Sequence, residues 1–330
     1  MNTSRNVPRV TILSVLALAI VIICPFLGLK NLTLSQIIDN EELRHIFFII
    51  RIPRTLAAFV AGGGLAIAGM VYQALFRNPL ASPYTLGVSG GASLGAAICI
   101  AAGAGGSVMG FSFISLGSFV GAVAAVLLVY SFAWSRESNS ITLLLAGVVV
   151  ATVCSGLIMF VHYISPLRHS FQIMRWIMGG VDGTSYSLLG IMAVPVFLYL
   201  CVAGILMPQL DQFLTGDSLA HSRGVDLHKS RNTFIIITAI AIGAIVSVCG
   251  PIGFVGIMAP HACRMILTGA RHRLLAVGAF MLGGAFLTIS DTLARIITPP
   301  AEIPVGIITA LCGGPFFLYI LFRRKGRLYL

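Results

Sequence analysis

The chain has 330 residues, of which 58% are hydrophobic and only 9% are charged, and its formal net charge is +11. Soluble domains carry roughly 25% charged residues, so this composition excludes an ordinary soluble protein and indicates an integral membrane protein. The basic residues fall singly between apolar runs, without the clusters and interleaved aromatic residues of a nucleic-acid surface, so we predict membrane lipid and no nucleic acid as a partner.

Long apolar runs predict an all-α protein with about ten transmembrane helices. The runs lie at about 10–29, 52–76, 86–105, 111–134, 141–164, 187–207, 232–249, 257–268, 274–295 and 304–322. They are continuous, which excludes the short alternating strands of a membrane β-barrel. With the N-terminus in the cytoplasm, 14 of the 21 Lys and Arg residues fall on the inner side, so we expect both termini to be cytoplasmic.

The stretch from Arg51 to Gly95 has the most ordered pattern. Arg51 and Arg54 flank a proline just before an uncharged run at 56–76, which has about the 20 residues that a bilayer crossing needs. After Asn78 and two prolines, Ser82 is expected to cap a second helix that Pro83 begins. Glycines 87, 91 and 95 then recur every fourth residue, which predicts a helix face that either packs closely on a neighbour or lines a pore.

The sequence GPIGFVGIMAP at 250–260 holds three glycines and two prolines. It predicts one short or broken helix near 250–268, opened by Pro260 and His261, with the irregular backbone either bordering a transport path or making a tight outer turn. The outer loop at 165–186 contains Trp176, so a short interfacial helix is expected there. The inner loop at 208–231 is either a solvated connector or a docking surface for a cytoplasmic partner.

Asp291 is the one carboxylate inside a predicted membrane helix, and Arg295 follows it one turn later. The acid-first i,i+4 order predicts a structural salt bridge. The alternative is that Asp291 handles protons or substrate, as in an ion-coupled secondary transporter.

Other chemistry is not indicated by the sequence. The seven cysteines form no C-x-x-C pair and the histidines show no ligand spacing, so no metal site is predicted. There is no nucleophile–base pattern in the helices and no G-x-x-x-x-G-K-[ST] motif. The chain is therefore expected not to be an enzyme and to hold no cofactor, so any ATP-driven cycle needs a separate subunit.

Four blocks of sequence, in this order, resemble the FecCD family of permease subunits of type II ABC importers. They are RIPRTLAAFVAGGGLAIAGMVYQ, RNPLASPYTLGVSGGA, GPIGFVGIMAPHACR, and the run from DTLAR through AEIPVGIITALCGGPFF. The resemblance implies one transmembrane permease domain over 1–330, paired in a homodimer in the cytoplasmic membrane of a prokaryote. It implies two partner subunits that bind ATP–Mg and a periplasmic or lipid-anchored binding protein. Alternating access would then import a metal chelate, namely a ferric siderophore, haem or cobalamin.

The same resemblance implies roles for individual residues. Binding-protein glutamates would dock on Arg51, Arg54 and Arg295. The cytoplasmic gate would be formed by Asn78, Leu80, Ser140, Ile141 and Thr142. The ATPase would contact the coupling loop at about 208–231 through Gly216, Asp217, Ala220, Arg223 and Gly224. Thr215 and Arg223 stand where the family pattern has leucines.

Overall fold

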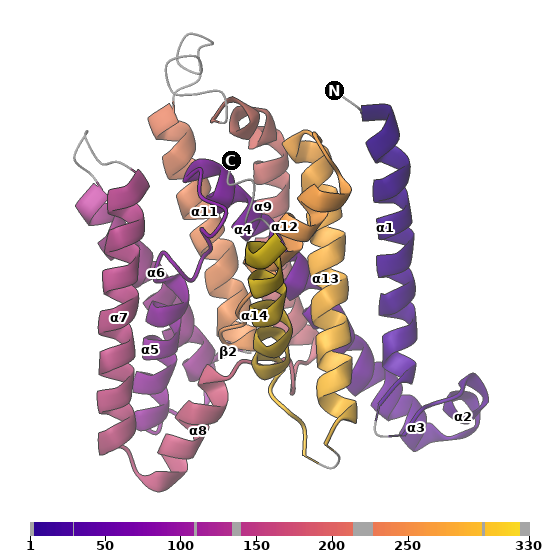
Figure 1. Ribbon diagram of the computed structural model, residues 1–330. Coiled ribbons are helices and arrows are strands. Elements are labelled where there is room, and N and C mark those ends of the chain that lie inside the picture. The colour runs from indigo at the N-terminus through magenta and orange to yellow at the C-terminus, as the bar shows by residue number, and fades with distance from the viewer. Residues whose placement is uncertain are drawn as a thin grey trace.

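A computed structural model describes residues 3–28, 30–108, 111–133, 140–213, 227–298 and 301–323. These residues form a bundle of helices that run between two ends (Figure 1). Seven helical segments are long and apolar enough to cross a membrane, and they contain α1 (Thr3–Ile23), α4 (Ile52–Leu75), α6 (Phe113–Ala133), α7 (Ser140–Ile164), α9 (Tyr186–Phe213), α11 (Leu227–Cys249) and α13 (His272–Ile296). The shorter helices are α2 (Leu34–Asp39), α3 (Glu41–His45), α5 (Val88–Ala101), α8 (Leu167–Ile177), α12 (Val255–Ile266) and α14 (Val305–Arg323). The remaining elements are a 3-10 turn (Cys24–Phe26), a π-helical turn (Ile46–Arg51) and the antiparallel strands β1 (Ser107–Val108) and β2 (Phe111–Ser112).

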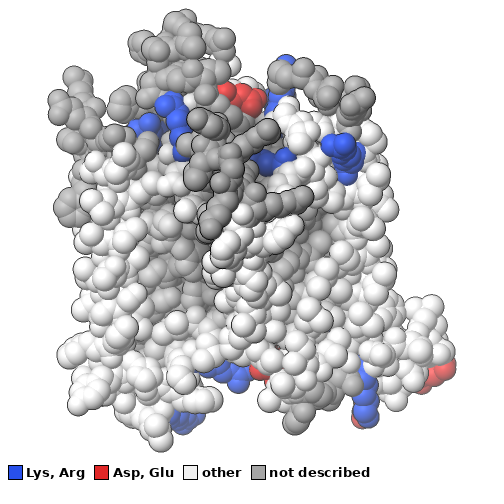
Figure 2. All heavy atoms as spheres, in the orientation of Figure 1, with Lys and Arg blue, Asp and Glu red and all other residues white. Residues whose placement is uncertain are grey.

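The surface of the bundle is that of a membrane protein. Charged side chains gather at the two ends, and a broad belt without them lies between (Figure 2). Helices α1, α7 and α9 turn large apolar side chains outward, among them Ile12, Leu145 and Ile205. Lipid tails are as apolar as these side chains, so their exposure carries no cost within a bilayer. The prediction of a helical membrane protein is confirmed.

Helix α4 is the centre of the bundle. Of its most apolar stretch, 83% is buried inside the protein, against 17% for α1 and for α7. Small residues allow this burial, because a side chain at Gly62 would meet the carbonyl of Gly283 in α13, and one at Gly69 would meet the carbonyl of Gly256 in α12. Close backbone approach of this kind supplies the packing that holds membrane helices together.

The broken helix predicted near 250–268 is confirmed, but its start differs from the prediction. Residues 250–254 are not helical, and the backbone takes positive φ at Gly250 (64°) and at Phe254 (66°). Helix α12 begins at Val255, so Pro260 lies inside it and does not open it. Because proline has no amide hydrogen, the carbonyl of Gly256 has no donor from residue 260, and this carbonyl is the group that Gly69 approaches.

The start of α5 also differs from the prediction. Ser82 does not cap a helix, because it forms a local turn in which its amide donates to Thr85 Oγ1 (3.0 Å) and Thr85 Oγ1 donates to its carbonyl (2.7 Å). The helix begins at Val88, five residues after the predicted start at Pro83, and follows Gly87 with φ 76°. Gly91 and Gly95 then pack against the backbone of Gly121 and Gly117 in α6. The glycine face is therefore a helix contact.

The interfacial helix predicted around Trp176 is present as α8, an amphipathic helix at the lower end of Figure 1. Helix α1 begins at the opposite, upper end, and α14 runs toward that same end. In the same view α13 runs from the upper end at His272 to the lower end at Ile296.

Candidate functional site

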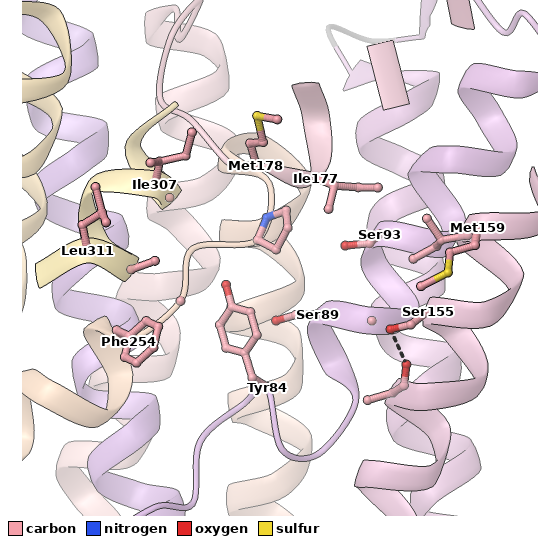
Figure 3. Close-up of a pocket in the computed structure, with 17 residues that line it drawn as sticks. Tyr84, Ser89, Ser93, Ser155, Met159, Ile177, Met178, Phe254, Ile307 and Leu311 are labelled. Carbon is pink, nitrogen blue, oxygen red and sulfur yellow. Dashed lines mark hydrogen bonds between the residues drawn. The ribbon is translucent and has the colours of Figure 1, made fainter. Parts of the chain in front are cut away.

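A cavity of about 860 Å³ opens between α5, α7, α14, the end of α8 and the irregular segment that precedes α12 (Figure 3). None of the 17 described residues that line it is charged. The ring of Tyr84 projects into it between Phe254 and Ser89, and the hydroxyls of Ser93 and Ser155 lie on the same side as Ser89. The wall is thus apolar with a few hydroxyl groups and no charged side chain among the described residues.

The irregular segment before α12 forms one side of this cavity. The carbonyl of Cys249 accepts a hydrogen bond from Gly180 N (2.8 Å), and the carbonyl of Gly179 accepts one from Gly306 N (3.3 Å). Phe254 lies against Gly313 of α14, where any side chain would meet its ring. Neighbouring segments therefore pack against the irregular backbone and are hydrogen-bonded to the end of α11 beside it, so that this backbone is enclosed by protein, as irregular backbone at membrane depth requires.

A cluster of charged side chains lies at the lower end of Figure 1, where α4 begins and α13 ends. Arg54 Nε donates to both oxygens of Asp291 (3.0 and 3.1 Å), and its Nη2 donates to Oδ1 (2.8 Å). Arg54 Nη1 also pairs with Glu302 Oε2 at 2.7 Å. Arg295 Nε lies 3.4 Å from Asp291 Oδ2. The Asp291 side chain is 1% exposed and those of the two arginines 8% and 7%, whereas Glu302 is 41% exposed.

Arg51 and Arg295 also bind backbone carbonyls in the connection between α1 and α4. Arg51 donates to the carbonyls of Pro25 (3.0 Å), Phe26 (3.4 Å) and Lys30 (2.9 Å). Arg295 Nη1 donates to the carbonyl of Leu27 at 3.4 Å. The three arginines with an expected docking role therefore lie at one end of the bundle, but Arg54 and Arg295 are buried in ion pairs and only Arg51 is half-exposed.

The other predicted site residues lie apart from this cluster. Asn78 Oδ1 accepts a hydrogen bond from Leu80 N (2.9 Å), while Leu80 is 55% and Ile141 is 70% exposed. Ser140 and Thr142 belong to the first turn of α7. The predicted coupling residues Gly216, Asp217, Ala220, Arg223 and Gly224 lie outside the described residues. Within the described part of the chain, no group of three or more His, Cys, Asp or Glu side chains could hold a metal ion.

Two features of the site have no signal in the sequence. The pair of Arg54 and Asp291 joins residues 237 positions apart, and the cavity wall is assembled from segments between Tyr84 and Leu311. The adjacent Arg295 was the expected partner of Asp291, yet the shorter and better aligned contacts come from Arg54. Spacing along a helix reports only neighbours on that helix.

An apolar helical bundle with an uncharged cavity and charges at its two ends defines a multi-pass membrane protein. A model of the FecCD transport family matches residues 15–323, and the chain belongs to this family. It is 38% identical over 308 residues to the hemin transport system permease protein HmuU of Yersinia pestis, covering 91% of this chain and 90% of that protein. It is 36% identical over 288 residues to the vitamin B12 import system permease protein BtuC of Yersinia enterocolitica, with 87% and 84% covered.

Solved structures agree with this assignment. A chain from an ABC transporter in an inward-facing conformation, described as of the metal-chelate type, superposes with a TM-score of 0.87 at 27% identity, over 96% of this chain and 99% of that one. PsaBC from Streptococcus pneumoniae shares the fold alone, with a TM-score of 0.56 at 14% identity. This chain is thus the non-catalytic permease subunit of a bacterial ABC importer.

Proposed function

We propose that the cavity is one half of a transport path that two copies of the chain form around a shared axis, and that its cargo is a metal chelate. The observation that carries this proposal is the uncharged wall of a cavity of about 860 Å³ in a permease of this family. A wall without charges offers a solute weak contacts at many points, which favours passage over retention. The relatives named for hemin and vitamin B12 support haem, cobalamin or a ferric siderophore as cargo.

In this proposal the whole chain, 1–330, is one transmembrane permease domain with ten crossings and both termini in the cytoplasm. The lower end of Figure 1 is then the outer side. Two ATPase subunits, which bind ATP–Mg, contact the coupling loop at about 208–231 on the inner side. Asn78, Leu80 and the first turn of α7 at Ser140, Ile141 and Thr142 form the inner gate, and the exposure of Leu80 and Ile141 supports a position where side chains can meet a second subunit.

Filling the cavity should stop transport without stopping ATP hydrolysis. Ala310 is on the cavity wall, so Ala310→Trp is expected to reduce uptake of labelled cargo into liposomes to near background, because the indole occupies the path. The assay uses the permease with its ATPase and binding protein, and ATP hydrolysis is measured in parallel. Ile205→Trp is the matched control, since Ile205 is 73% exposed on α9 and outside the cavity. Full uptake by Ala310→Trp would refute the cavity as the path.

We also propose that the outer end, with Arg51, Arg54 and Arg295, receives carboxylates of the binding protein. Reversing Arg54 or Arg295 would also place two acids together in a buried cluster, so the variant that leaves this cluster intact is Arg51→Glu. At low ionic strength its association with the binding protein should be about tenfold slower than wild type, and the difference should shrink as salt rises. Surface plasmon resonance on permease in nanodiscs measures this rate. Arg9→Glu, at the opposite end, is the control, and equal rates for both variants at low salt would exclude the docking role of Arg51.

A further inference from the structure

The last turn of α9, residues Gln209–Phe213, is here called the stem. It follows Pro208, which has no amide hydrogen to donate to the carbonyl of Gly204, so this turn is less firmly joined to the rest of α9 than an ordinary helical turn. The predicted coupling residues begin at Gly216, three positions beyond Phe213. The stem is thus the piece of described structure that leads directly into the segment expected to meet the ATPase.

Three neighbouring segments hold the stem through side-chain contacts. Ser230 Oγ of α11 donates to Gln209 Oε1 at 2.7 Å. Arg77 Nε, from the turn after α4, donates to the carbonyl of Phe213 at 2.9 Å. The third contact joins Asp211 to His272, the first residue of α13. It is the shortest of the three, and both the backbone N–H and the ring of His272 take part in it.

Asp211 Oδ1 accepts the backbone N–H of His272 (3.2 Å) and lies 2.5 Å from its Nδ1. Because a carboxylate can only accept, Nδ1 of His272 carries the proton in this contact. The side chain of Asp211 is 33% exposed and that of His272 is 5% exposed. Arg271, at the N-cap position of α13, supplies no side-chain cap, so the carboxylate of a different helix caps α13 and lies where the helix dipole favours an anion.

Helix α13 connects this contact to the charged cluster at the outer end. Its 25 residues span roughly 37 Å, from His272 to beyond Asp291 and Arg295. Gly283 and Gly284 bring it into backbone contact with Gly62 and Phe59 of α4, which leaves little room for bending. Helix α13 is therefore a continuous element that joins the contact at His272 to the ion pair with Arg54 at its other end.

We propose that Asp211 and His272 are positioning residues that transmit movement of the coupling loop through α13 to the outer charged cluster. This inference rests on the proposed function, because it takes the loop after the stem as the ATPase contact. Through this pair, movement driven by nucleotide at the inner side and release of the binding protein at the outer side become parts of one displacement. The two residues act as one contact in this proposal, so the test is a mutant cycle on that contact with coupled transport as its readout.

The experiment compares wild type, Asp211→Ala, His272→Gln and the double variant, each assembled with ATPase and binding protein in liposomes. The readout is the amount of cargo imported per ATP hydrolysed. Each single variant should lower this ratio about tenfold or more, the size expected for losing a hydrogen bond to a charged group. The double variant should lose about as much as the more impaired single variant, and hydrolysis without binding protein should stay within about twofold of wild type. Asp211→Asn keeps an oxygen for His272 N–H and should fall between wild type and Asp211→Ala.

Glu41→Gln is the matched control, since it removes a carboxylate from an ion pair with Arg44 that is exposed and far from the stem. It should leave the ratio of cargo to ATP unchanged. A wild-type ratio in both Asp211→Ala and Asp211→Asn, or losses that multiply in the double variant, would overturn the role of the pair. If wild-type liposomes showed no uptake that depends on ATP, the proposed function itself would fail, and the two failures are therefore distinct.

Discussion

Asp291→Ala should destabilise the folded permease by about 3–5 kcal/mol, because it leaves two guanidinium groups buried without their shared carboxylate. Asp291 is 1% exposed and is bound by Arg54 and Arg295, whose side chains are 8% and 7% exposed. Glu302 remains as a partner for Arg54 only. The loss is measured as a lower midpoint of thermal unfolding in detergent and a lower yield of monodisperse protein.

The control for this variant is Glu41→Ala, which removes a carboxylate that is 92% exposed and should change stability by no more than about 0.5 kcal/mol. Equal midpoints for Asp291→Ala and Glu41→Ala would contradict a stabilising role for the buried cluster. Asp291→Asn keeps the size and an acceptor oxygen, so more of it should fold. Its uptake per folded molecule should match wild type if Asp291 is structural, and should vanish if Asp291 carries the protons of an ion-coupled transporter.

Gly69→Ala should have the second large effect, about 3 kcal/mol of lost stability, because a methyl group there meets the carbonyl oxygen of Gly256. Both atoms belong to helix backbones, α4 and α12, so neither can rotate away as a side chain would. The helices would have to separate, and α12 carries the irregular segment that forms one side of the cavity. Thermal unfolding and loss of uptake should therefore appear together in this variant.

Two other glycines make this prediction specific. An added methyl at Gly63 meets first the ring of Phe280, a side chain that can shift, so Gly63→Ala should be milder. Gly190 of α9 has nothing within 4 Å, and Gly190→Ala should be neutral or more stable by up to about 1 kcal/mol, as in an exposed helix interior. If Gly69→Ala and Gly190→Ala unfolded at the same temperature, close packing of α4 on α12 would not limit stability.

The sequence predicted the helical membrane bundle because run length and lack of charge report directly on a bilayer. Each of the ten apolar runs overlaps a helix, and the break before Val255 followed from its glycines and prolines. Local signals were less reliable at helix starts. Ser82 and Pro83 have the residue types of a helix start, but reciprocal bonds between Ser82 and Thr85 stabilise a turn there instead.

The site was less predictable because it depends on contacts between distant segments. Arg54 was read as an outward docking residue, and only the packing of α4 on α13 shows that its guanidinium is occupied by Asp291. The cavity combines Tyr84, Ser89 and Phe254 with α14, and none of these residues has a pattern that marks a pathway wall. The contact between the stem and α13 could not be predicted for the same reason, since Asp211 and His272 are 61 residues apart.

Uptake into sealed liposomes tests the central claim most directly. Permease, partner ATPase and binding protein are reconstituted, and the entry of labelled haem or cobalamin is followed with ATP inside or outside and with proton and sodium gradients collapsed by ionophores. Uptake should require hydrolysable ATP on the ATPase side and the binding protein on the other, and should be unaffected by the ionophores. Uptake that proceeds without ATP and stops when the ion gradients are collapsed would contradict the assignment of this chain as an ATP-driven permease.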